Sequence, residues 1–80
     1  MKKYPYKKEV ICFTGKSLYT RINMQQLAKK AGADITHNIT NKTTLLVVGQ
    51  RSGSKLDRAF EKGVQIVADE EFLIKIKAFL

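Results

Sequence analysis

Short apolar runs alternate along this chain with longer segments in which apolar residues recur at helical spacing. The runs predict strands at residues 10–14, 34–36, 45–48 and 65–67, because a strand covered on both faces is apolar throughout. The longer segments predict helices, so the expected order is β-α-β-β-α-β-α. Strands that alternate with helices in this way favour a largely parallel sheet, and therefore an α/β fold.

The first expected helix lies between the first two strands. Its apolar positions follow helical spacing at Met24, Leu27, Ala28 and Ala31. Thr20 can cap its amino terminus, and Gly32 can end it. The segment therefore predicts one amphipathic helix that packs on the sheet.

The two later helices have similar signals at their ends. Ser54 is expected to cap the second helix, because Asp57 follows at capping-box spacing, and Gly63 is expected to end it. Asp69 is expected to cap the third helix. The two apolar faces are predicted at Leu56, Ala59 and Phe60, and at Phe72, Leu73, Ile76, Phe79 and Leu80.

Length and charge narrow the range of functions. Eighty residues can close one small core, so a single domain is expected and a stand-alone enzyme is disfavoured. The 15 Lys and Arg against 7 Asp and Glu leave a net charge of +8, which favours a polyanionic partner such as nucleic acid or a phosphorylated segment. Residues 1–8 hold lysines around Pro5 and predict a flexible basic arm, followed by a domain at residues 9–80.

Several other classes of function are disfavoured. Cys12 has no second cysteine to pair with, and its apolar surroundings predict a buried thiol in a reducing, cytoplasmic setting. No apolar stretch is long enough to predict a membrane span. Gly15-Lys16-Ser17 is like the end of a P-loop but lacks the first glycine of that motif, and His37 is a lone histidine. No metal, cofactor, small-molecule substrate or catalytic residue is therefore expected.

Four short motifs together resemble the BRCT family, over residues 9–76. They are Phe13-Thr14-Gly15, Ala31-Gly32-Ala33, Lys42-Thr43 before Leu45-Leu46-Val47-Val48, and Gly53-Ser54-Lys55-Leu56-Asp57-Arg58-Ala59. The chain is most similar to the BRCT modules of bacterial NAD-dependent DNA ligases and of the large subunit of the clamp loader, replication factor C. Phe72 stands where many members of the family have a tryptophan.

The resemblance implies a specific arrangement of the expected elements. The four parallel strands would lie in the order 2-1-3-4. The first and third helices would cover one face of the sheet, and the second helix would cover the other.

A phosphate site is expected where the first strand ends. Thr14 and Gly15 follow that strand, at an edge where ligands meet helix amino termini. A threonine hydroxyl can donate a hydrogen bond, glycine lets an oxyanion approach the backbone, and Lys55 adds a positive charge from the second helix. The resemblance also implies phosphate binding by Thr14, Gly15 and Lys55. The adjacent Lys16 is included in the predicted site.

Arg21 is a further candidate, in the first turn of the first helix. A cation there is unfavourable by about 0.3–1 kcal/mol unless an anion compensates. The related ligase and clamp-loader modules are similar at this position, which implies contact with a 5′-terminal phosphate of DNA. A structural turn at Thr14 and Gly15, and solvated surface cations at Lys16, Arg21 and Lys55, remain the alternative interpretations.

Two functions fit these residues. The leading hypothesis is a non-catalytic module that binds DNA at a 5′-phosphorylated end or nick, in replication or repair, in the cytoplasm or, in a eukaryote, the nucleus. The alternative is a phosphopeptide- or protein-binding module that docks a replication or repair partner, for which Arg21 would be dispensable. An enzyme is disfavoured, because one His and one Cys do not assemble a nucleophile, a base and an orienting group.

Overall fold

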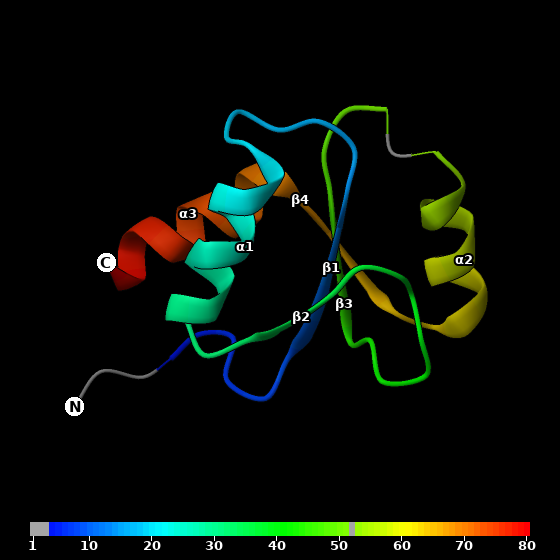
Figure 1. Ribbon diagram of the computed structural model, residues 1–80, viewed down its shortest axis with the longest axis horizontal. Helices are drawn as coiled ribbons and strands as arrows, with labels where there is room; N and C mark the ends of the chain where they lie inside the picture. The colour runs from blue at the N-terminus through cyan, green and yellow to red at the C-terminus, as the bar shows by residue number, and fades with distance from the viewer. Residues whose placement is uncertain (1–3, 52) are drawn as a thin grey trace.

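The structure is a computed structural model that describes residues 4–51 and 53–80. Its strands are β1 (Val10–Thr14), β2 (Asp34–Thr36), β3 (Leu45–Val48) and β4 (Gln65–Ala68), and its helices are α1 (Arg21–Lys30), α2 (Ser54–Lys62) and α3 (Asp69–Phe79). The strands form one sheet in the order β2-β1-β3-β4, and every neighbouring pair is parallel (Figure 1). The predicted α/β fold and strand order are confirmed.

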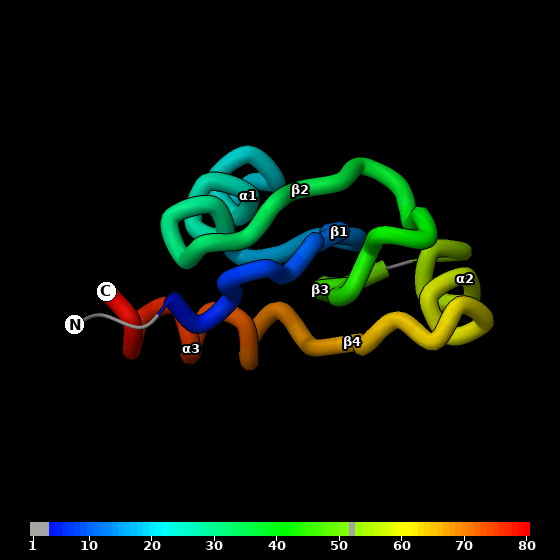
Figure 2. The backbone as a smooth tube through the Cα atoms, turned by 90° about the horizontal axis from the view of Figure 1, so that it is seen from below, coloured from blue at the N-terminus to red at the C-terminus, as the bar shows by residue number. Residues whose placement is uncertain are grey.

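The helices cover the sheet unequally. In Figure 2, which looks along the layers, α1 and α3 lie beyond one face and α2 lies beyond the other, as predicted. Alternation along β1 supplies both faces: Phe13 packs in the cluster beneath α1 and α3, and Cys12 packs in the cluster beneath α2. The central strands β1 and β3 are therefore buried on both sides, which explains their continuous apolar sequence. The edge strands β2 and β4 are exposed or half-buried, so the expectation of cover on both faces is wrong for them.

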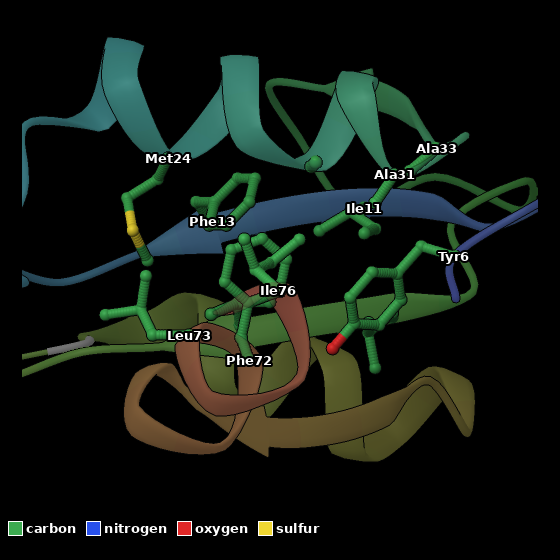
Figure 3. Close-up of a cluster of buried hydrophobic side chains, with 12 residues drawn as sticks. Tyr6, Ile11, Phe13, Met24, Ala31, Ala33, Phe72, Leu73 and Ile76 are labelled. Atoms are coloured by element: carbon green, nitrogen blue, oxygen red, sulfur yellow. The ribbon is translucent and has the colours of Figure 1, made fainter. Parts of the chain in front are cut away.

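Aromatic rings fill the centre of the larger cluster (Figure 3). Phe72 of α3 is fully buried, and its ring lies 5.4 Å from that of Phe13 in an edge-on arrangement. The Tyr6 ring also stacks on Phe72, with 5.2 Å between the centroids. Phe72 thus anchors α3 to the sheet and to the chain ahead of β1.

The expected flexible arm is wrong for residues 4–8. Only 5% of Tyr6 is exposed, and its backbone N–H donates a 3.1 Å hydrogen bond to the carbonyl of Ala31. The Tyr4 ring contacts Phe79, and the Lys75 ammonium lies 5.2 Å from the centre of the Tyr6 ring. Two aromatic rings therefore bind this segment to the core despite its charge, and residues 1–3 lie outside the described part.

The helix ends agree only in part with prediction. Thr20 caps α1 as predicted, because its hydroxyl oxygen accepts a hydrogen bond from the backbone N–H of Asn23. Gly63 ends α2 in the left-handed conformation, also as predicted. The capping box at Ser54 is wrong: Gly53 is the residue that precedes α2, and Ser54 lies inside the first turn without a side-chain cap bond.

Two further details differ from the expected pattern. Asp69 lies in the first turn of α3 rather than at its cap, which is Ala68, although its carboxylate accepts a 2.9 Å hydrogen bond from the next backbone N–H. On α2, Ala59 is buried and Leu56 is half-buried, but Phe60 is 82% exposed. The sheet face under α2 therefore covers a narrower strip of the helix than the sequence pattern predicts.

Candidate phosphate site

A pocket of about 280 Å³ lies where β1 ends and α1 begins. Its lining combines the end of the strand, the connecting loop and the first turns of the helix: Phe13, Thr14, Gly15, Lys16, Ser17, Tyr19, Thr20, Arg21 and Met24. The pocket therefore brings together four of the five predicted site residues. It stands at the carboxyl edge of a parallel sheet and beside a helix amino terminus, where backbone N–H groups and the helix dipole favour anions.

Gly15 is required by the packing of two loops. Its φ is +80°, and an added Cβ would lie 2.5 Å from the carbonyl oxygen of Gln50. Lys16 and Gln50 bridge the same loops, with backbone hydrogen bonds of 2.7 and 2.8 Å in the two directions. Gly15 thus has the structural role left open above, and the Lys16 backbone N–H is bonded to protein. The exposed side chain is the part of Lys16 that can reach a ligand.

Arg21 and Lys55 are both held by neutral carbonyl groups. The Arg21 guanidinium donates a 3.2 Å hydrogen bond to the carbonyl oxygen of Gly15 at the pocket wall. The half-buried Lys55 ammonium donates a 2.9 Å hydrogen bond to the carbonyl oxygen of His37, directly after β2. The first turn of α1 contains no acidic residue. Neither hydrogen bond neutralises its cation, because the acceptors are uncharged carbonyl groups, so both charges can act on an anion.

Lys55 is outside the lining of the pocket, which differs from the expected single clamp. Its charge nevertheless acts on the middle of β1, at Cys12. Burial raises the pKa of the Cys12 thiol above its usual value, and the positive charges of Lys55 and then Arg21 oppose that rise. The two cations therefore influence one buried atom from two helices, α2 and α1.

Several pocket residues were not predicted as part of the site. Ser17, Tyr19 and Thr20 line it beside the predicted residues. Thr20 was recognised only as a helix cap, and Ser17 only as part of a P-loop-like sequence. An aromatic residue in a glycine- and lysine-containing loop is the signal that could have identified Tyr19. The partners of the cations are backbone carbonyls, which have no sequence signature.

The described residues hold neither a metal centre of clustered ligands nor a membrane-spanning helix. Residues 4–51 and 53–80 contain no group of three His, Cys, Asp or Glu side chains that could hold a metal ion. Over the same ranges, no helix has both the length and the apolar character that crossing a membrane demands.

Comparison with protein families gives a clear match. The family model for the BRCA1 C Terminus (BRCT) domain matches residues 5–73. The chain belongs to the BRCT family. The match includes Tyr6, which agrees with the place of this residue in the core. BRCT domains are binding modules.

Curated relatives of this BRCT domain are bacterial DNA ligases. One from Petrotoga mobilis is 43% identical over 72 residues, covering 89% of this chain and 11% of the ligase. Another from Chlorobium chlorochromatii is 39% identical over 64 residues, covering 79% of this chain and 10% of the ligase. The chain thus spans about a tenth of the length of these relatives.

Solved structures show the same fold. The BRCT1,2 segment of Rad4 in complex with a Crb2 phosphopeptide matches with a TM-score of 0.78 and 23% identity, over all of this chain and 45% of that one. The same segment with a Mdb1 phosphopeptide matches with a TM-score of 0.76 and 25% identity, over 94% of this chain and 42% of that one. The predicted BRCT resemblance is confirmed.

Proposed function

We propose that this BRCT domain is a non-catalytic module that binds the 5′-terminal phosphate of DNA, during replication or repair, in the cytoplasm. One observation carries the proposal: a single pocket joins the Arg21 guanidinium, the Lys16 side chain, Thr14 and Gly15 at the amino terminus of α1. A terminal phosphate fits a small pocket of this kind because it ends the chain and carries more charge than a backbone phosphate. An arginine can contact it through two N–H groups at once.

Charge and relatives both support DNA as the ligand. The net charge of +8 attracts a polyanion over distance. The relatives with the identities given above are DNA ligases. Lys55, in the first turn of α2, adds a second cation whose charge acts on Cys12 of β1 and which does not line the pocket. We assign it to a neighbouring phosphate or to long-range attraction, and Arg21 to the terminal phosphate itself.

A phosphopeptide is the alternative ligand. Two structural neighbours were solved with phosphopeptides, and the same pocket could hold a phosphorylated side chain. The two ligands differ in how their affinity should depend on salt. A single phosphoserine or phosphothreonine would depend on the pocket, but it would not give affinity that falls steeply with salt, because few counterions are released.

The decisive experiment compares binding of 5′-phosphorylated and 5′-hydroxyl duplexes of identical sequence. Arg21→Glu is expected to weaken binding to the phosphorylated duplex by about ten- to a hundredfold, because a charge-assisted hydrogen bond is lost. Lys42→Glu is the matched control: it makes the same charge change on an exposed residue in the loop that leads into β3, at the amino-terminal end of the strands rather than the carboxyl end.

The outcomes separate the two ligands. Binding that is the same for both duplexes would reject the 5′-phosphate proposal. So would an Arg21→Glu variant that binds phosphorylated DNA no worse than Lys42→Glu. Phosphopeptide binding in that same Arg21→Glu variant would then establish the protein-interaction function instead.

A further inference from the structure

Three large apolar side chains are exposed beside the phosphate pocket. Leu18 is 83% exposed, Ile22 is 66% exposed and Tyr19 is 37% exposed. We name Leu18, Tyr19 and Ile22 the apolar rim. Its members flank the pocket residues Thr20 and Arg21 along the chain, and Tyr19 itself lines the pocket.

The members of the apolar rim lie close together in the sequence, unlike the other exposed apolar residues. The other large exposed apolar residues of the described part are spread over the N-terminal segment, α2, β4 and α3: Tyr4, Phe60, Ile66, Ile74 and Leu80. Isolated exposed apolar residues are ordinary on a protein surface. Three within five positions, next to cations on a protein of net charge +8, indicate a ligand with both a phosphate and an apolar surface.

The charge around the pocket differs from one side to the other. A groove of about 660 Å³ adjoins the pocket and shares Lys16 and Ser17 with it. Asp69 and Glu70, directly after β4, also line this groove. A continuous DNA backbone would place phosphates on both sides of the bound one, and on this side they would approach two carboxylates. A strand that ends at the pocket avoids that repulsion.

We propose that the apolar rim packs against the terminal base pair of DNA whose 5′-phosphate occupies the pocket. This inference rests on the proposed function and adds a specificity to it. At an open end the flat face of the last base pair is exposed and can be covered by apolar side chains. At a nick the same base pair is stacked on its neighbour, so the rim has nothing to cover. The domain therefore selects open 5′ ends over nicks.

The experiment compares binding to a 5′-phosphate at an open DNA end with binding to a 5′-phosphate at a nick. The first probe is a hairpin with a single open 5′-phosphorylated end. The second is a duplex closed by hairpin loops at both ends, with the same sequence around a 5′-phosphorylated nick. The wild-type domain is expected to prefer the open end by about five- to tenfold, from the apolar contact with one base pair. Matching probes with a 5′-hydroxyl group measure the phosphate dependence of each.

The variants test the rim directly. The double variant Leu18→Ser/Ile22→Ser is expected to lose the preference for the open end while it keeps the dependence on the 5′-phosphate. Phe60→Ser is the control, because Phe60 is about as exposed as Leu18 but lies on α2, and it should keep both properties. Neither Thr20, which caps α1, nor Arg21 is altered, so the pocket stays intact.

Each result decides the inference. Equal binding of the nick and the open end by the wild-type domain overturns it. So does a double variant that retains the preference, or a Phe60→Ser variant that loses it to the same degree. If phosphate dependence persists in these cases, the proposed function stands and only the rim inference fails. If the wild-type domain ignores the 5′-phosphate on both probes, the proposed function and this inference fail together.

Discussion

The two faces of the sheet differ in what they bury. The face under α1 and α3 holds three aromatic rings and nine other side chains in a cluster of 12 residues, and the N-terminal segment closes it. The face under α2 holds a smaller cluster: Cys12, Ile39, Leu46, Ala59 and Val64. Buried apolar area is the main source of stability. The first face therefore holds the domain together, and the second holds α2, with its cation Lys55, more weakly.

The largest expected effect comes from truncating one buried side chain on each face and comparing the losses of stability. Phe72→Ala, on the first face, is expected to lower the free energy of unfolding by about 3–5 kcal/mol, because it empties the centre of the larger cluster. Leu56→Ala, on α2, is expected to cost less than about 2 kcal/mol, since that side chain is only half-buried. Urea unfolding measures both. Equal losses would show that the two faces contribute alike.

The N-terminal segment sharpens the comparison, because it belongs to the first face. Tyr6→Ala is expected to lower the free energy of unfolding by about 3 kcal/mol, through loss of the ring that stacks on Phe72. Tyr4→Ala is the control, because Tyr4 is 51% exposed, and it should cost clearly less. Thermal unfolding of both variants is the measurement. A Tyr6→Ala variant as stable as the control would restore the interpretation of this segment as a flexible arm.

Each face of the sheet includes one residue whose burial was predicted wrongly: Tyr6 on the first face and Phe60 on the second. The strands and helices were predictable, because a buried run and a helical repeat are local signals. Tyr6 was missed because charged neighbours dominate its local composition. Phe60 was assigned to the core because helical spacing predicts a face but not how much of that face the sheet covers.

The candidate site was predictable to a similar extent. The types of residue in the pocket could be inferred from where strands end and helices begin. The close contact of Gly15 with Gln50, and the bond from Lys55 to the His37 carbonyl, join segments far apart in the chain. Such contacts arise only from the tertiary fold, so no local pattern could predict them.

The helix amino termini give a third, smaller test without ligand. Arg21→Glu should leave the domain equally stable or stabilise it by about 0.3–1 kcal/mol, because an acid replaces a cation at the amino terminus of α1. Lys55→Glu should change stability little, since the same gain at α2 is offset by loss of the bond to the His37 carbonyl. Thermal unfolding at low salt is the measurement. Clear destabilisation by Arg21→Glu would make that cation a structural residue.

The smallest expected effect concerns Cys12, which reports on the face under α2. Burial raises the pKa of its thiol, so the thiolate is scarce at neutral pH and labelling by a thiol reagent should be slow. The rate should rise as the pH approaches that raised pKa. Lys55 is the leading charge that opposes the rise, so Lys55→Glu should raise the pKa further and slow labelling at pH 8.

The change in rate should be modest, below about tenfold, because Lys55 only opposes the larger effect of burial on this pKa. Lys42→Glu, in the loop that leads into β3, should leave the rate unchanged. Faster labelling in Lys55→Glu would have a different cause: the bond from Lys55 to the His37 carbonyl would then be what keeps α2 closed over Cys12. In that case the rate would be set by how often α2 opens and lets the reagent reach Cys12, and not by the fraction of thiolate. Such local opening costs little free energy where few buried side chains hold a helix.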